Sequence, residues 1–235
     1  MNPRVIVIDE PIHIHDETAC KLWQKALWMK ELGYRNHYKS SVLPVGVDDF
    51  VASHLIVADQ KKNGELEPMV MYKSIRKSQA DKFKIPFGGL SLLNTTKYQN
   101  DKEIISVIND GGDISYDSSW TINPIYKSDK ETSQLLRDFV TMFCCNHHKE
   151  FGFSRWLTAG VKQFKIDDYF EWLGGKQILP EFQLEIIDNQ FVRMFYIPDT
   201  LHLPAEPLAT AKKMDSYWNN RMVFVPEKSV YEKVA

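Results

Sequence analysis

The sequence predicts a mixed α/β fold, and three observations indicate it. Patterns typical of strands and helices alternate through residues 113–178, in the order strand, turn, helix, strand, helix. The other two observations are pairs of β-rich segments joined by turn residues, each predicting a hairpin: residues 53–59 with 69–75, and residues 182–187 with 191–197. The chain shows no internal repeats, and together these patterns favour a single domain.

The N-terminal part opens with a short strand candidate, Val5–Ile8, and a first helix over residues 18–32. An apolar stripe at i, i+4 and i+7 spacing defines this helix: Leu22, Ala26 and Met29. Gly33 follows and is placed as a C-cap. Residues 36–46 are polar and predict a loop, and Pro86–Gly89 predicts a turn or loop.

The central run places a helix start beside a strand end. A β-rich stretch ends in Trp120–Pro124, and the polar turn Lys127–Lys130 leads into an amphipathic helix that runs to about His148. A second strand, residues 156–160, precedes a helix that ends at Leu173–Gly175. A helix N-terminus offers unpaired backbone N–H groups, so a phosphate-bearing cofactor can bind there.

The chain is divided into three parts on composition and pattern. Residues 1–17 are interpreted as an N-terminal arm and residues 18–200 as the main domain. Residues 201–235 are punctuated by prolines and contain one short helix candidate near residues 209–218. Because this last part is too short for a core of its own, we expect an arm packed on the same domain.

Composition argues against several classes of function. The formal net charge is -2 with both signs interspersed, unlike the basic patches of nucleic-acid-binding proteins. No apolar run approaches the roughly 20 residues that span a bilayer, and the N-terminus lacks the pattern of a secretory signal. The 3 cysteines, two of them adjacent, do not make a disulfide framework. We therefore expect a cytoplasmic protein with reduced thiols.

Four short motifs stand at defined places in this element order. Trp120–Tyr126 closes a strand, and Asp168–Gly174 closes a helix. Val47–Phe50 precedes a strand, and Lys73–Arg76 follows the next one. Over roughly residues 18–198, the element order and motifs resemble the GNAT N-acyltransferases. Within that superfamily they are similar to the autoinducer synthases and the long-chain N-acyl amino acid synthases.

The resemblance implies a central mixed, mostly antiparallel sheet flanked by helices, with two neighbouring strands splayed apart. The donor would be an acyl-CoA or acyl-carrier-protein thioester whose pantetheine arm lies in the gap. The acceptor would be a small-molecule amine, and no metal is expected. The residues implied to hold the donor are Ile122, Asn123, Lys127, Lys130, Thr132, Ser133 and Thr158. The backbone amides near Ile122 and Asn123 would polarise the thioester carbonyl.

The sequence departs from the glycine-rich phosphate loop of the family. Residues 126–134 contain no glycine, although glycines let backbone amides approach a pyrophosphate closely. Lys127, Lys130 and Ser133 could supply charge and hydrogen bonds, while the nearby carboxylates oppose an anion. A carrier-protein donor, a loop of altered shape and the loss of donor binding all account for the change.

The candidate catalytic acid is displaced by one residue. Alignment on Leu173-Gly174 puts Phe170 where many relatives have a tyrosine that protonates the leaving thiolate. Tyr169 is adjacent, but neighbouring residues on a helix point about 100° apart. A thiolate can leave without strong acid help, because a thiol has a pKa of about 8.5. The alternative for Tyr169 is a packed aromatic with its hydroxyl at the rim.

Asp117 is the candidate general base for the acceptor amine. It would act through water positioned by the hydroxyls of Ser118 and Ser119, and Asp113 is a second candidate carboxylate. The alternative for Asp117 is an exposed acid at a strand end. Autoinducer synthases carry a Glu and an Arg on this strand, which fall near Tyr116 and Ser119 and are not retained. This difference argues against a homoserine-lactone product.

Three other groups of residues have a spacing or composition that a functional site could use. His13 and His15 have a spacing that can ligate zinc or iron, but no third ligand is fixed by the sequence. The histidines of Cys144–His148 follow one another on a helix and cannot converge with the cysteines on one metal. Five aromatic residues could line an acyl tunnel or fill the core: Trp23, Trp28, Phe50, Phe87 and Phe139.

Two function classes therefore rival the acyltransferase. One is a binding or sensing protein with a GNAT fold whose donor site has decayed. The other is a metal enzyme centred on His13 and His15.

Overall fold

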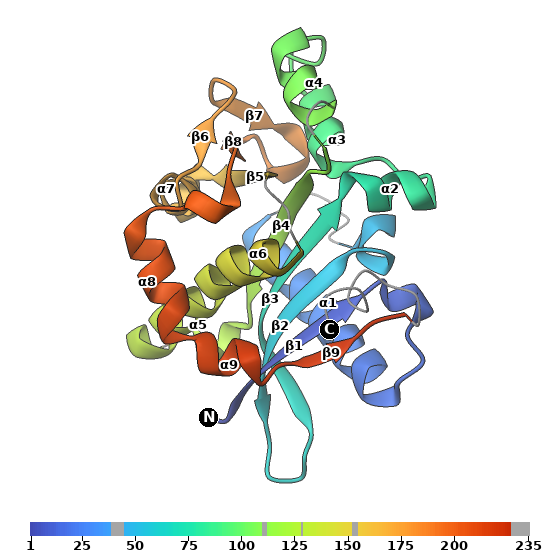
Figure 1. Cartoon of the computed structure of the whole chain (residues 1–235), viewed down its shortest axis with the longest axis vertical. Helices are drawn as coiled ribbons and strands as arrows, with labels where there is room; N and C mark the ends of the chain where they lie inside the picture. The colour runs from blue at the N-terminus through green and yellow to red at the C-terminus, as the bar shows by residue number, and fades with distance from the viewer. Residues whose placement is uncertain (39–44, 110–111, 128, 152–154, 227–235) are drawn as a thin grey trace.

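The computed structural model of the chain describes residues 1–38, 45–109, 112–127, 129–151 and 155–226 (Figure 1). The described strands are β1 (Pro3–Asp9), β2 (Ser53–Gln60), β3 (Leu66–Arg76), β4 (Ser115–Ile122), β5 (Trp156–Val161), β6 (Lys176–Gln177), β7 (Phe182–Leu184), β8 (Gln190–Ile197) and β9 (Met222–Phe224). The described α-helices are α1 (Glu17–His37), α2 (Lys77–Phe83), α3 (Gly88–Asn94), α4 (Lys102–Asn109), α5 (Lys130–Met142), α6 (His148–Phe151), α7 (Ile166–Trp172), α8 (Ala205–Lys213) and α9 (Asp215–Asn219). The predicted mixed α/β class is confirmed.

The strands form one mixed sheet with the order β6-β8-β5-β4-β3-β2-β1-β9, and β7 also pairs with β8. The pairs β4–β5 and β1–β9 are parallel, and the other pairs are antiparallel. Both predicted hairpins are present, as β2–β3 and β7–β8. The second is shorter on its first strand, because residues 185–187 form a 3-10 turn before Asp188 and Asn189 reverse the chain with positive φ.

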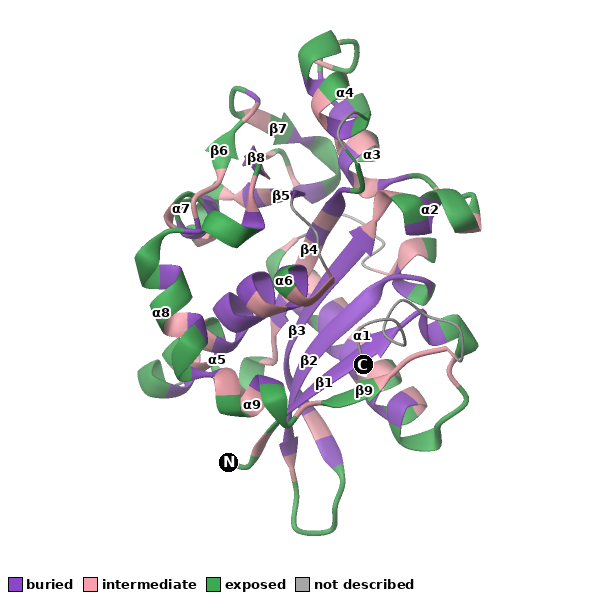
Figure 2. Ribbon diagram, in the orientation of Figure 1, coloured by how far each residue is buried: buried purple, intermediate pink, exposed green. Residues whose placement is uncertain are grey.

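Alternation along β1 divides the core between the two faces of the sheet. Val5 and Val7 belong to the cluster that includes α5, α8 and α9. Ile6 and Ile8 belong to the cluster beneath α1. Figure 2 shows β1, β2 and β3 buried along most of their length, with helices on both sides of them.

Each of the two expected arms, residues 1–17 and 201–235, contributes a strand to the sheet, and residues 227–235 lie outside the described residues. Residues 3–9, expected within an N-terminal arm, form β1 between β2 and β9, because both faces of this apolar strand are covered. Residues 222–224, expected within a C-terminal arm, form β9. The single helix expected near residues 209–218 is two helices, α8 packed on α5 and the short α9 that follows it.

Helix α1 is longer than predicted, and Gly33 is not its C-cap. The helix continues through Asn36 to His37, so part of the expected 36–46 loop is helical, and residues 39–44 lie outside the described residues. A Cβ atom on Gly33 would lie 2.8 Å from Cγ2 of Thr121 on β4. The glycine is therefore needed for close packing of α1 on β4. The expected loop at Pro86–Gly89 also differs, because α3 begins at Gly88.

A buried ion cluster joins α1 to β3. Lys30 donates to both carboxylate oxygens of Asp49 at 2.8 Å, and Lys73 Nζ lies 3.1 Å from Asp49 Oδ1. Lys73 also contacts Asp48, whose side chain is partly exposed. Burial and then the neighbouring Lys73 charge lower the pKa of Lys30 to about 8. The two buried cations depend on the Asp49 carboxylate for compensation.

We predict that Asp49→Asn destabilises the fold by about 3–5 kcal/mol, because two buried ammonium groups lose their shared counterion. Asp48→Asn removes a partly exposed carboxylate beside the same lysine and should cost about 1 kcal/mol or less. Urea unfolding of both variants measures the difference. Equal effects of the two substitutions would contradict this account of the cluster.

Candidate functional site

The strands β4 and β5 part in the middle of the sheet. They pair at Ser115 with Trp156, Tyr116 with Leu157 and Asp117 with Thr158, and the pairing ends there although both strands continue. We call the gap between residues 118–122 of β4 and 159–161 of β5 the fork. A cavity of about 280 Å³ lies in it.

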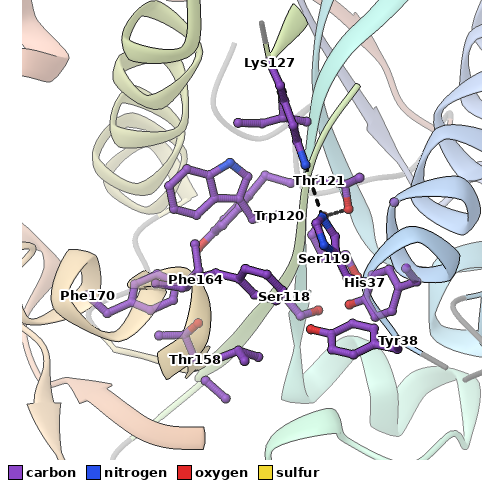
Figure 3. A pocket seen from close by; sticks show the side chains of 17 residues that line it. His37, Tyr38, Ser118, Ser119, Trp120, Thr121, Lys127, Thr158, Phe164 and Phe170 are labelled. Carbon is purple, nitrogen blue, oxygen red and sulfur yellow. Dashed lines mark hydrogen bonds between the residues drawn. The ribbon is translucent and has the colours of Figure 1, made fainter. Parts of the chain in front are cut away.

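The cavity is lined by both strands, the end of α1 and the segment that includes α7 (Figure 3). Its lining residues are Gly33, Tyr34, His37, Tyr38, Tyr72, Ser118, Ser119, Trp120, Thr121, Ile122, Lys127, Thr158, Ala159, Val161, Phe164, Ile166 and Phe170. Apolar and aromatic walls with a few polar groups are typical of small-molecule sites.

A β-bulge shapes the β4 side of the fork. The register shifts so that Ser119 and Trp120 together stand opposite Tyr72 of β3. Ser119 has φ of 59°, a left-handed conformation that is uncommon for residues with a side chain. Bulges of this kind redirect backbone groups and often stand next to active sites.

The backbone amides of Ile122 and Asn123, which the family resemblance implies would polarise the thioester carbonyl, have different surroundings. The N–H of Asn123 donates to the carbonyl of Met69 at 2.9 Å, and the Asn123 side chain contacts Pro68 and Ile125. In this structure the Asn123 amide is therefore already engaged by β3. Because successive N–H groups of a strand point to opposite sides, the amide of Ile122 points toward the fork.

The start of α5 is closed by its own cap. The Asp129 carboxylate accepts a hydrogen bond from the Thr132 N–H at 2.7 Å, and the Asp129 carbonyl accepts one from the Ser133 N–H at 3.0 Å. The Ser133 hydroxyl donates to the Lys127 carbonyl at 3.4 Å. Hydrogen bonding to Thr132 lowers the pKa of Asp129, which keeps a negative charge at the helix start. An anion placed here would have to displace that carboxylate.

Of the residues implied to hold the donor, Ile122, Lys127 and Thr158 line the cavity. Thr158 donates its hydroxyl to the main-chain carbonyl of Asp117 at 3.0 Å, at the last pair of residues before the two strands separate. Lys130, Thr132 and Ser133 lie in the first turn of α5.

His37 and Lys127 form a polar pair at the cavity. His37 Nε2 lies 3.4 Å from Lys127 Nζ, and the His37 ring packs at 4.8 Å from the ring of Phe164. Partial desolvation, and then the Lys127 charge, lower the pKa of His37 below its usual value near 6.5. Desolvation also lowers the pKa of Lys127. His37 is therefore a neutral base at neutral pH.

Asp117 lies behind the cavity wall. It is fully buried, so the alternative of an exposed strand-end acid is wrong. Its Oδ1 accepts from Ser74 at 2.7 Å and its Oδ2 from Tyr72 at 3.0 Å. Ser118 and Ser119 line the cavity, whereas Asp113 bonds Ser78 at the start of α2.

Tyr169 and Phe170 point in different directions on α7. Phe170 lines the cavity, whereas the Tyr169 hydroxyl lies 2.9 Å from the hydroxyl of Thr141 on α5. Tyr169 is 1% exposed, so its hydroxyl is not at a rim, and its ring packs against the Trp120 ring at a tilt of 55°. Burial raises the pKa of Tyr169 well above its usual range, which keeps it protonated.

The five aromatic residues considered as the lining of an acyl tunnel do not form one cluster. Phe139 and Phe87 lie in separate core clusters, Trp23 packs against Phe50, and Trp28 is 61% exposed. The cavity is lined instead by other aromatic residues, among them Tyr34, Tyr38, Trp120 and Phe164.

Neither a metal cluster nor a spanning helix occurs within the described ranges. His13 contacts Glu10 at 3.3 Å, and no group of three or more His, Cys, Asp and Glu in those ranges is arranged to hold a metal. None of the helices there is both long enough and apolar enough to cross a membrane.

Solved structures provide the comparison. BjaI, described as a CoA-dependent acyl-homoserine lactone synthase with MTA, is 10% identical, with 99% of each chain covered and a TM-score of 0.50. The chain has a GNAT-like acyltransferase fold. At this identity the likeness to BjaI supports the fold alone.

Two further structures have the same general likeness to this GNAT-like chain. MesI, a CoA-dependent acyl-homoserine lactone synthase, is 10% identical, covering 92% of this chain and 95% of its own, with a TM-score of 0.48. FeeM, an N-acyl amino acid synthase from uncultured soil microbes, is 13% identical, covering 74% and 88%, with a TM-score of 0.47. No family model and no curated protein matches the sequence.

We predict that Lys127→Met raises the pKa of His37, because the neighbouring positive charge is removed while the stem of the side chain is retained. NMR titration of the His37 ring measures this change. Lys130→Met, at the exposed first residue of α5, is the matched control and should leave the pKa of His37 unchanged. An unchanged His37 titration in Lys127→Met would contradict the pairing.

Proposed function

We propose that the chain is an N-acyltransferase that moves an acyl group from a thioester donor to a small-molecule amine. The observation that carries this proposal is the cavity in the fork, beside the bulge at Ser119 and the inward-pointing amide of Ile122. An extended pantetheine arm can pair with a strand edge that has lost its neighbour, as peptides do in β-augmentation. The GNAT-like fold agrees with this assignment.

The wall of the fork also holds an unpaired donor. The indole Nε1 of Trp120 is buried and has no hydrogen-bond partner among the described residues. An unsatisfied buried N–H costs about 1–3 kcal/mol. Because Trp120 lines the cavity, a ligand carbonyl that reached this N–H would satisfy it.

In the proposed reaction, the amine nitrogen attacks the thioester carbonyl. The new C–N bond forms, the C–S bond breaks, and the thiolate leaves. His37, neutral and exposed at the cavity, accepts the proton that the amine loses. The developing oxyanion accepts a hydrogen bond from the Ile122 amide. The thiolate takes a proton from solvent or from the His37 imidazolium.

The donor is proposed to be a thioester carried by a protein-bound pantetheine arm. The Asp129 carboxylate occupies the helix start where the pyrophosphate of CoA would need backbone amides. A carrier protein keeps its single phosphate at its own surface, so it makes a smaller demand on this helix start. An acyl-carrier protein is therefore favoured over acyl-CoA.

A direct assay tests the function. Acyl-CoA, acyl-pantetheine and acyl-carrier protein are each offered with pooled amines, and thiol release and amide mass are measured. Ala159→Leu, which fills the cavity from β5, should abolish turnover while leaving the circular dichroism unchanged. Absence of both ligand-induced thermal shift and thiol release for all three donors would support the binding-protein alternative.

His37→Gln is predicted to lower kcat by about 100-fold, the usual scale of general-base catalysis. Because the base must be unprotonated, wild-type activity should fall as the pH drops through the lowered pKa of His37. Lys127→Met raises that pKa, so its acidic limb should move to higher pH. Profiles of kcat against pH for the three proteins test this, and identical acidic limbs would rule out His37 as the base.

Asp129→Ser is predicted to improve the use of acyl-CoA. Serine retains the N-cap of α5 but removes the negative charge, so KM for acyl-CoA should fall about fivefold, or about 1 kcal/mol. KM for acyl-pantetheine, which has no phosphate, is the internal control and should stay constant. Equal changes in KM for both donors would contradict the proposal that the Asp129 carboxylate disfavours the pyrophosphate of CoA.

A further inference from the structure

A second polar group lies behind the fork and is not used by the reaction proposed above. His148 follows a π-helical turn, Phe143–His147, that continues α5. Its side chain is fully buried, as is that of Asp117 on β4. Nε2 of His148 lies 3.1 Å from Oδ2 of Asp117. Short π-helical turns inside helices are frequent at functional sites.

The two ring nitrogens of His148 each face a hydrogen-bonding group. Nδ1 lies 2.8 Å from the carbonyl oxygen of Cys144. A carbonyl accepts but never donates, so Nδ1 carries a proton. Nε2 faces a carboxylate oxygen, and an unprotonated Nε2 would place two lone pairs against each other. A ring protonated on both nitrogens satisfies both of these contacts, and the Ser115 hydroxyl also lies 3.1 Å from Nε2.

The surroundings of the pair favour this charge. Both Asp117 oxygens accept hydroxyl protons, from Ser74 and from Tyr72, as an ionised carboxylate does. Burial raises the pKa of Tyr72 and of Cys144 far above their usual values, so both stay neutral. Burial likewise lowers the pKa of His147, which stays neutral too. A buried carboxylate needs a compensating charge, and among the side chains named here that contact Asp117, His148 is the group that can carry one.

The pair is connected to the cavity through Tyr72. Tyr72 lines the cavity and stands opposite the bulge at Ser119. Its hydroxyl donates to Asp117 and accepts from the Cys144 thiol at 3.4 Å, so the end of its ring is held from two elements. We propose that His148, as an imidazolium paired with Asp117, is a positioning residue that fixes Tyr72 against the bulge. Its effect on turnover rests on the acyl transfer proposed above.

The first test measures the ion pair without any substrate. In protein labelled with ¹⁵N-histidine, both ring nitrogens of His148 should be protonated at pH 7, with His148→Gln giving the assignment. Asp117→Asn should convert His148 to a ring with one unprotonated nitrogen. An unprotonated His148 nitrogen in the wild-type protein at pH 7 would overturn the inference, whether or not the chain transfers acyl groups.

The second test measures positioning by a double-mutant cycle. His148→Gln and Tyr72→Phe should each lower kcat about tenfold, since a small misplacement at a reacting centre has a large effect on rate. Because both act through one chain of contacts, the double variant should be within twofold of the slower single variant. His147→Gln removes an equally buried imidazole one residue away and is the matched control.

Multiplicative losses in the double variant, or an equal loss of kcat in His147→Gln, would overturn the positioning role. Tyr72→Phe keeps the ring, so it reports on the role even if His148→Gln fails to fold. If the wild-type protein forms no amide with any donor, the proposed function fails, while the NMR result still decides the ion pair.

Discussion

The organisation of this molecule depends on one break in its sheet. Two parallel strands that would normally continue to exchange hydrogen bonds separate after Asp117 and Thr158. Backbone groups along both edges then need other partners, because unpaired polar groups inside a protein are costly. A site that receives an extended polar ligand meets that need. Thr158 fixes the last point of contact by bonding the Asp117 carbonyl.

Charged groups on both sides of the sheet support the break. On the α1 side, Asp49 in the segment Val47–Phe50 holds one lysine of α1 and one of β3, and so joins these two elements. On the α5 side, Asp117 gathers Ser74, Tyr72 and His148 at the point where the strands separate. Buried ion pairs contribute little net stability, but removing one partner is expensive. Such groups therefore specify the arrangement of the elements more than they strengthen it.

Much of the fold could be predicted because it follows from local patterns. The stripe Leu22, Ala26 and Met29 gave the correct face of α1, and Asn123-Pro124 correctly ended a strand. The end of α1 could not be predicted, since Gly33 has the signature of a cap but is required by packing on Thr121. The sequence predicts that His37 lies in a loop, so it does not identify this residue as part of the site. The tertiary structure brings it to the cavity.

The close contact at Gly33 has a consequence for the breadth of substrates that the fork can admit. The distance between α1 and β4 is set by the absence of a side chain, with 2.8 Å from a hypothetical Cβ to Thr121. Any larger residue there would lift the helix, and with it Tyr34 and His37, away from the fork. The size of the residue at position 33 thus sets the spacing between α1 and β4 at the site. Paired substitutions at Gly33 and Thr121 would change the width of the fork.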